Sequence, residues 1–317
     1  MTAPEVTVVI PTHGRPDMVG DAVRSALAQE GAAIEVVVVV DGDDPATLAA
    51  LGRIGDGRLR VVRPGTRLGN AGARNAGLDA ARGEWVALLD DDDLWLPGKL
   101  AAQLAHARAM RAGGVALPIV SCRFEARSDA AAFVWPRRLP RPGEPMAEYL
   151  FCRRTPPSGD GVVQTSTILA PRALFERVRF DPGCLRFVDV DWLLRAAREP
   201  GARLGFAAPD RPLSVWRMED RPRVSTEGTW RHDVAWIAAR AALVTPRAAA
   251  AFLLTLPSIR AAREGDRRAF GALLAHALRA GRPGWAELAF HLGNFAIPHG
   301  LRHGLARRAG GGTARGG

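Results

Sequence analysis

The sequence predicts an α/β protein built on a doubly wound, mostly parallel sheet. Over the first hundred residues, short β-branched runs alternate with helical patterns, and the run IEVVVVV (34–40) is apolar at nearly every position. Strands that are apolar on both faces belong to parallel sheets that are covered by helices on each side. Short connections between alternating strands and helices give β-α-β units with right-handed crossovers.

Each element of this first part has its own local signal. Strands are short apolar runs, and helices carry apolar residues at the spacing i, i+3, i+4. Pro45 follows Asp44, the combination of capping residue and first-turn proline that starts a helix. The predicted order is strand 6–10, a helix from Pro16, strand 34–40, a helix from Pro45, strand 59–62, helix 70–81, strand 85–89 and helix 97–111.

The rest of the chain is less regular. The pattern predicts strand 162–170, helices 171–178 and 189–198, strand 213–217, and helices rich in Ala, Leu and Arg after Trp230. The tail 307–317 has the composition of a disordered segment. We expect one domain over residues 1–225, divided near residue 111, and a helical C-terminal region over 226–317.

The net charge of +10 is concentrated in one region. Residues 240–317 hold 12 arginines and 3 acids, whereas the preceding residues are almost balanced. We therefore predict no nucleic-acid partner. The 3 cysteines show neither disulfide nor zinc-site spacing, which favours a reducing, cytoplasmic setting.

Two interpretations of residues 240–317 stay open. The region is either a packing subdomain that shows its arginines to water, or a peripheral contact with an anionic membrane at the inner face. The apolar run 248–257 is too short to span a bilayer, so in the second case it would lie in the interface. The N-terminal residues MTAPE lead directly into a strand pattern, so we expect no signal peptide.

Polar residues follow three of the predicted strands. They are PTHGR (11–15), DGDD (41–44) and DDDD (90–93). The carboxyl ends of parallel strands meet at one edge of a sheet, and ligands bind there. The sequence therefore predicts a ligand site that draws on all three segments.

The run Asp90–Asp93 sets four like charges beside a buried strand, where their repulsion is costly. A divalent cation, Mn²⁺ or Mg²⁺, would relieve it, because both ions prefer carboxylate oxygens completed by substrate phosphates. In the alternative, Asp93 or a neighbour caps the helix near Pro97 and the other carboxylates face water.

The run and its context LWLPGKLAAQL resemble the metal-binding motif of inverting family 2 glycosyltransferases with the GT-A fold. Other segments resemble that family in the same order: VTVVIPTHGR (6–15), VVVVDGDD (37–44), GNAGARNAGLDAARGEWVALLDDDD (69–93) and FVDVDWLLRAA (187–197). The resemblance covers about residues 6–220. It implies a metal-dependent transfer of a sugar from a nucleoside-diphosphate sugar to an acceptor hydroxyl, with inversion.

The resemblance also implies a role for each matching residue. Residues 1–111 would bind the nucleotide-sugar and residues 112–225 the acceptor, which is a glycan, a lipid-linked sugar or a small molecule. Asp92 would bind the metal, with Asp90 as a further candidate ligand, and Asp189 would be the general base, with helix capping as its alternative. The residues that would contact the nucleotide-sugar are Pro11, Thr12, Arg15, Asp41, Arg74, Asp90 and Asp91. Asp43 and Asp44 are better interpreted as turn and cap residues.

The sequence departs from the family pattern in several places, among them His13 and Gly14, which stand where an aromatic residue and Asn are common. The second strand ends in Asp41-Gly42-Asp43-Asp44 rather than Asp-Asp-Gly-Ser, Val188 replaces a glutamate before the base, and no histidine follows the late strand. Val188 and the missing histidine support an alternative, a non-catalytic nucleotide-sugar-binding protein. A sugar-1-phosphate nucleotidyltransferase ranks lower, because the first loop contains a single glycine.

Overall fold

The computed structural model describes residues 3–128, 131–155, 160–218 and 228–297. The chain forms two compact units. Unit 1 contains residues 1–135 and 163–225, and unit 2 contains residues 136–162 and 226–317. Glu219, Asp220 and the tail 307–317 lie outside the described residues. The predicted domain boundaries at 111/112 and 225/226 stay predictions.

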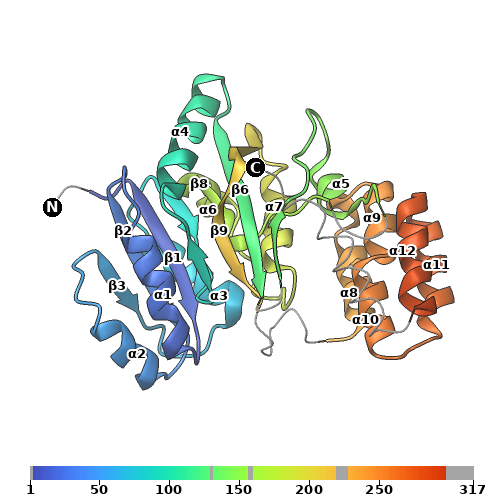
Figure 1. Cartoon of the computed structure of the whole chain (residues 1–317), viewed down its shortest axis with the longest axis horizontal. Coiled ribbons are helices and arrows are strands. Elements are labelled where there is room, and N and C mark those ends of the chain that lie inside the picture. The colour runs from blue at the N-terminus through green and yellow to red at the C-terminus, as the bar shows by residue number, and fades with distance from the viewer. Residues whose placement is uncertain (1–2, 129–130, 156–159, 219–227, 298–317) are drawn as a thin grey trace. The chain divides into compact units, whose positions relative to one another are not determined.

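The first part of unit 1 alternates strands and helices as predicted (Figure 1). Its elements are β1 (Val6–Thr12), α1 (Pro16–Leu27), β2 (Ile34–Val40), α2 (Pro45–Gly52), β3 (Leu59–Val62), α3 (Gly69–Ala80), β4 (Trp85–Leu88), β5 (Asp93–Trp95) and α4 (Lys99–Ala112). Asp44 caps α2, since its side chain accepts a hydrogen bond from the Thr47 amide. Helix α4 begins two residues later than predicted because Gly98 has a left-handed backbone with φ of 78°.

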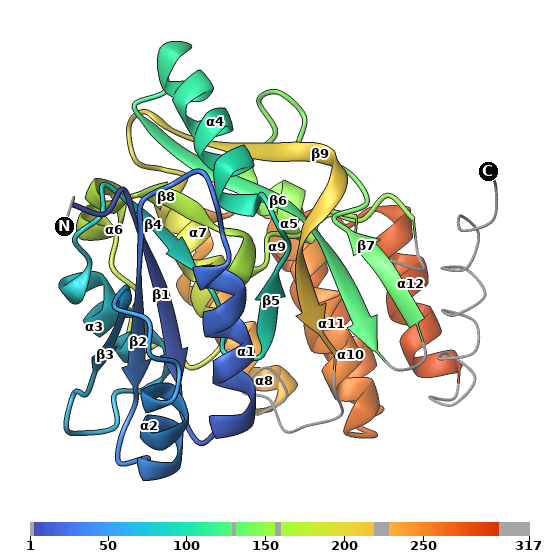
Figure 2. The ribbon, with the colours of Figure 1, turned by 60° about the vertical axis from the view of Figure 1, so that its left-hand side comes forward.

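Strands β3, β2, β1 and β4 lie side by side and are parallel. All seven residues of β2 are buried. One face of the sheet packs against α1 and α4, and the other packs against α3 through Val37, Val39 and Ala73 (Figure 2). Coverage on both faces explains the unbroken apolar run of β2 and confirms the predicted layering.

Helix α3 approaches the sheet closely. A Cβ atom added at Gly77 would lie 2.4 Å from a methyl group of Val9 and 3.2 Å from one of Val39. Small residues in α3 therefore serve packing at this position. The approach holds the N-terminus of α3 at the carboxyl edge of the sheet, near the ends of β1 and β2.

The second part of unit 1 makes the sheet mixed. Its elements are β6 (Leu117–Ser128), β7 (Ala131–Trp135), the short 3-10 helix η1 (Thr165–Thr167), β8 (Leu169–Pro171), α6 (Arg172–Arg177), α7 (Val188–Ala196) and β9 (Ala202–Arg217). The described strands follow the order β3-β2-β1-β4-β8-β6-β9-β5, and β7 pairs with β6.

The predicted strand 162–170 is wrong over most of its length. Residues 165–167 form η1, and β8 occupies only Leu169–Pro171. Thr167 Oγ1 donates a hydrogen bond to the backbone carbonyl of Gln164 at 2.6 Å. Such local bonds from Ser and Thr compete with strand pairing.

The regular elements in the described part of unit 2 are helices. They are α5 (Met146–Phe151), α8 (Trp230–Ala239), η3 (Ala241–Leu243), α9 (Pro246–Leu253), α10 (Leu256–Arg263), α11 (Ala269–Ala280) and α12 (Trp285–Ala296). The Glu287 carboxylate of α12 is fully buried, where Arg247 Nη2 donates to it at 2.7 Å and the Arg153 amide at 2.6 Å. This carboxylate ties residues 136–162 to the C-terminal helices.

The expectation that residues 248–257 lie in a membrane interface is wrong. Ala248, Ala250, Ala251, Phe252 and Leu254 are completely buried inside unit 2. Phe252 packs against the rings of Phe151 and Trp236, with centroids 5.0 and 5.4 Å apart. The run is apolar because it forms this core. Over the described residues, none of the helices has the length and apolar character needed to cross a bilayer.

Candidate active site

Asp90, Asp91 and Asp92 lie between β4 and β5, and Asp93 is the first residue of β5. Oxygen atoms of Asp90, Asp92 and Asp93 all lie within 4.8 Å of one another, which is the spacing of a metal-binding group. Asp93 belongs to β5, is completely buried and does not cap α4, whose N-cap residue is Gly98. The capping alternative for Asp93 is therefore wrong.

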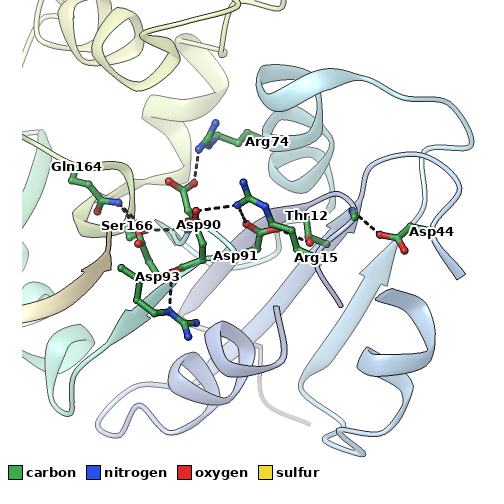
Figure 3. Close-up of polar contacts among 12 residues, drawn as sticks. Thr12, Arg15, Asp44, Arg74, Asp90, Asp91, Asp93, Gln164 and Ser166 are labelled. Carbon is green, nitrogen blue, oxygen red and sulfur yellow. Dashed lines mark hydrogen bonds and ion pairs between the residues drawn. The ribbon is translucent and has the colours of Figure 1, made fainter. Parts of the chain in front are cut away.

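Asp91 turns toward the loop after β1. Thr12 Oγ1 donates to Asp91 Oδ2 at 2.7 Å, and Arg15 Nη1 donates to Asp91 Oδ1 at 2.8 Å (Figure 3). The same nitrogen of Arg15 lies 3.0 Å from Asp92 Oδ2. Arg15, three residues after the end of β1, thus contacts two adjacent carboxylates. Pro11 lies within β1 and pairs with Val39 of β2.

Arg74 of α3 contacts the cluster from another side. Its Nη2 lies 2.5 Å from Asp90 Oδ1, and its guanidinium lies 5.7 Å from the centre of the Phe180 ring. The arginine side chain is 4% exposed. Its Nε and Nη1 atoms are buried and have no hydrogen-bond acceptor among the described residues. A buried donor without an acceptor costs about 1–3 kcal/mol, so this guanidinium is suited to an anionic ligand.

Three consecutive residues at η1 organise the carboxylates. Ser166 Oγ donates to Asp93 Oδ2 at 2.6 Å and accepts from the Asp90 amide at 3.0 Å. Gln164 Nε2 also donates to Asp93 Oδ2. Thr165 Oγ1 donates to Asp189 Oδ2 at 3.1 Å. Sequence reasoning missed this segment, because QTST was interpreted as part of a strand; its run of short polar residues was the available signal.

Asp189 lies in the first turn of α7 and is partly exposed. The N-cap residue is Phe187, whose backbone is left-handed, and no side chain caps the helix. Asp191 is buried and paired with Arg195, whose Nη2 lies 2.6 Å from Asp191 Oδ2. Of these two acids, Asp189 is the one whose carboxylate is not in an ion pair with a described residue.

Asp41 lies at the end of β2 and is buried. Its two oxygens accept hydrogen bonds from the backbone amides of Leu68 at 2.6 Å and Gly69 at 2.9 Å. It therefore holds the start of α3, a role the sequence did not indicate. A carboxylate has about four lone-pair positions, so two stay available for a ligand. Asp44 links the two loops, because it also accepts from the Gly14 amide at 2.8 Å.

The electrostatics of the cluster favour a bound cation. Burial raises the pKa of Asp90 to about 6, against the lowering effect of Arg74, and the charges of Asp92, Asp189 and Asp91 raise it further. Burial, together with Asp90 and Asp92, raises the pKa of Asp93 well above its usual value. Burial also raises the pKa of Asp91, with Arg15 opposing. Several carboxylates thus resist ionising together, and a cation would reverse this preference.

A mixed α/β sheet whose strands β3, β2, β1 and β4 are parallel, with an aspartate cluster after β4 and an acid at the start of α7, is typical of glycosyltransferases of the GT-A class. The family model described as Glycosyl transferase family 2 matches residues 7–176. The chain therefore belongs to this family, as predicted. Family membership favours glycosyl transfer over the activity of a sugar-1-phosphate nucleotidyltransferase.

Relatives share different lengths of the chain. The succinoglycan biosynthesis protein ExoO of Rhizobium meliloti is 44% identical over 106 residues, which are 33% of this chain and 30% of ExoO. The amylovoran biosynthesis glycosyltransferase AmsB of Erwinia amylovora is 29% identical over 223 residues, which are 68% of this chain and 70% of AmsB. The match to ExoO thus covers less than a third of that protein.

Solved structures confirm the fold. The mannosyltransferase PcManGT from Pyrobaculum calidifontis, in complex with GDP-Man and Mn²⁺, matches with a TM-score of 0.51 at 21% identity. The match covers 98% of this chain and 80% of that one. At this identity the likeness shows the GT-A fold alone.

Proposed function

We propose that the protein transfers a sugar from a nucleoside-diphosphate sugar to a saccharide hydroxyl, with inversion at the anomeric carbon and with a divalent cation. One observation carries the proposal. The acceptor-only cluster Asp90–Asp93 lies directly beside Arg74, whose buried Nε and Nη1 atoms have no acceptor among the described residues. A metal diphosphate presents a cation to the first group and an anion to the second.

The donor set fits a divalent metal. Asp93 Oδ1 and Gln164 Oε1 are buried acceptors without a donor among the described residues, and the oxygens of Asp90, Asp92 and Asp93 are close together. Oxygen atoms of this kind are the ligands that Mn²⁺ and Mg²⁺ prefer. Asp90 and Asp92 would hold the ion. Asp92 is the more exposed of the two acids that Arg15 contacts, and the buried Asp93 would lie on the protein side of the ion. When bound, the ion neutralises charge on the leaving diphosphate.

The chain's own residues would bind the rest of the donor. Arg74 would contact the phosphates through Nε and Nη1, and the remaining lone pairs of Asp41 would accept from the base. Asp91, held by Thr12 and Arg15, would lie near the ribose, and Pro11 would line the pocket. These assignments follow the family motif residue by residue, and the strand ends that carry them share one edge of the sheet.

Asp189 would act as the general base. The Thr165 hydroxyl holds one of its oxygens, and the Val190 amide donates to the other at 2.9 Å. A carboxylate positioned in this way takes the proton from the acceptor hydroxyl as that oxygen attacks the anomeric carbon. A single displacement from the face opposite the diphosphate inverts that carbon.

The relatives indicate the class of acceptor. ExoO and AmsB are named for the biosynthesis of succinoglycan and amylovoran, which are polysaccharides. We therefore propose a hydroxyl of a growing saccharide as the acceptor here. The sugar and the nucleotide of the donor are open, since side chains outside the motifs shape that pocket.

The test has two stages. A thermal-shift panel of nucleoside diphosphates, with and without Mn²⁺, identifies the nucleotide, because a ligand of the folded state raises the melting temperature. Transfer is then followed with the matching nucleotide-sugars and saccharide acceptors, and the anomeric configuration of the product is determined by proton NMR. Retention of configuration, or metal-independent transfer at the same rate, would contradict the proposal.

A further inference from the structure

Helix α12 exposes a row of large apolar side chains. Trp285 is 66% exposed, Leu288 39% and Leu292 58%. Their spacing of i, i+3, i+7 sets them on one face of the helix. The other face is buried in unit 2 through Ala286, Glu287, His291 and Asn294. The exposed face is therefore a feature of a well-anchored helix.

Over residues 267–297 every exposed charged side chain is an arginine. Residues 267–297 contain four arginines and a single acid. That acid is Glu287, which is fully buried and bound by Arg247. The four arginines are exposed: Arg267, Arg268, Arg279 and Arg282. In the sequence that follows, residues 298–317 add four more arginines and no acid.

We propose that the exposed face of α12 docks this protein on an anionic lipid bilayer, lying parallel to the membrane plane. Helices that bind in this way carry a tryptophan and leucines on one face and basic residues beside them. Tryptophan concentrates at the level of the lipid headgroups. Each arginine near an anionic surface strengthens binding about fivefold, which corresponds to about 1 kcal/mol.

Charge complementarity favours an anionic bilayer over a second copy of the chain as the partner of this face. Two copies of the chain that docked through this face would bring arginines close to arginines, and like charges at an interface oppose association. An anionic bilayer instead offers phosphates to the arginines and an apolar interior to Trp285 and Leu292. The proposal concerns unit 2 and goes beyond the sugar-transfer site of unit 1.

The test is sedimentation of the full chain with vesicles of phosphatidylcholine, with or without about 30% phosphatidylglycerol, at low and high salt. We expect binding to the anionic vesicles that weakens at high salt. The double variant W285Q/L292Q should lose this binding. R279Q/R282Q should weaken it about 25-fold, because two arginines are removed.

Matched controls come from unit 1. Leu185 is 79% exposed, so L185Q removes an exposed leucine there. Arg53 and Arg63 are also exposed, so R53Q/R63Q removes two exposed charges. Both controls should bind vesicles like the wild type, and all four variants should keep the wild-type melting temperature.

Three results would overturn the proposal. They are no binding at low salt, equal binding to neutral and anionic vesicles, and wild-type binding by W285Q/L292Q. Analytical ultracentrifugation adds a fourth, a dimer that W285Q/L292Q abolishes, which would assign the face to a second copy. The assay needs neither donor nor metal, so its failure leaves the proposed sugar transfer untouched.

Discussion

Thr165 and Asp189 are joined by a hydrogen bond in which Thr165 Oγ1 donates to Asp189 Oδ2 over 3.1 Å. The next residue, Ser166, makes the corresponding bond to Asp93 at 2.6 Å. The 3-10 helix η1 thus positions the proposed base with one side chain and the proposed metal cluster with the next. One turn therefore contacts both groups.

This relationship leads to a first prediction. T165V removes the hydroxyl but keeps the shape of the side chain, so Asp189 loses its orienting bond. A hydrogen bond to a charged group contributes about 1.5–3 kcal/mol, and we expect kcat to fall about tenfold or more with an unchanged KM for the donor. T165S keeps the hydroxyl and should restore most of kcat. Steady-state kinetics of the three proteins provides the measurement, and equal loss in T165S and T165V would refute an orienting role.

A second prediction concerns the base itself. D189N keeps the size of the side chain but cannot accept a proton, so transfer should fall by about 10²–10⁴-fold. Calorimetry should show the same donor affinity as in the wild type. D191N is the control, because Asp191 is buried against Arg195 rather than free. It should lower stability more than it lowers turnover, and the reverse pattern would transfer the role of base to Asp191.

The third prediction separates metal binding from folding. D92A should abolish the Mn²⁺-dependent binding of the nucleoside diphosphate without lowering the melting temperature, since it removes one of several mutually repelling charges. D43A is a matched control, because Asp43 is an exposed acid at another strand end. Calorimetry with and without Mn²⁺ measures the effect. Wild-type affinity and metal dependence in D92A would remove Asp92 from the proposed metal site.

Lys99 supports a fourth prediction, on the pH dependence of stability. It is the only lysine of the chain. It is fully buried, its Nζ donates to Gln103 Oε1 at 2.6 Å, and it lies 3.9 Å from the centre of the Trp95 ring. Burial lowers its pKa to about 8 from its usual 10.5. The unfolded chain therefore binds more protons between these values, and stability rises with pH there.

Between pH 7 and pH 10 this single group should add about 1–3 kcal/mol to the free energy of unfolding. Urea unfolding of the wild type and of K99M at both pH values measures the effect, because groups that do not interact with Lys99 titrate alike in the two proteins. The Cys122 thiol does interact with the Lys99 charge, which lowers its pKa, but burial raises that pKa to about 11, so the folded form keeps this thiol mostly protonated up to pH 10. An identical change with pH in the two proteins would mean that Lys99 is not buried as a titrating amine.

The sequence by itself determined the elements whose signals are local. Strand β2 and strand β3 begin and end where the apolar runs do, and Asp44 caps α2 because a capping residue and a proline stand next to each other. It also determined which strand ends are polar, and hence the edge at which the site forms. Periodicity and capping depend on neighbours in the chain, so one sequence is enough to predict them.

Only the tertiary structure decided the contacts between distant segments. Asp93 is held in the cluster by Ser166, which lies 73 residues further along the chain and donates a hydrogen bond to its carboxylate. Asp41 holds α3 through amides 27 and 28 residues further along the chain, and residues 248–257 are apolar because they are the core of unit 2 rather than an interface. A carboxylate or an apolar run looks the same in sequence whatever surrounds it, and its role is set by the packing that brings donors, cations or other apolar groups to it.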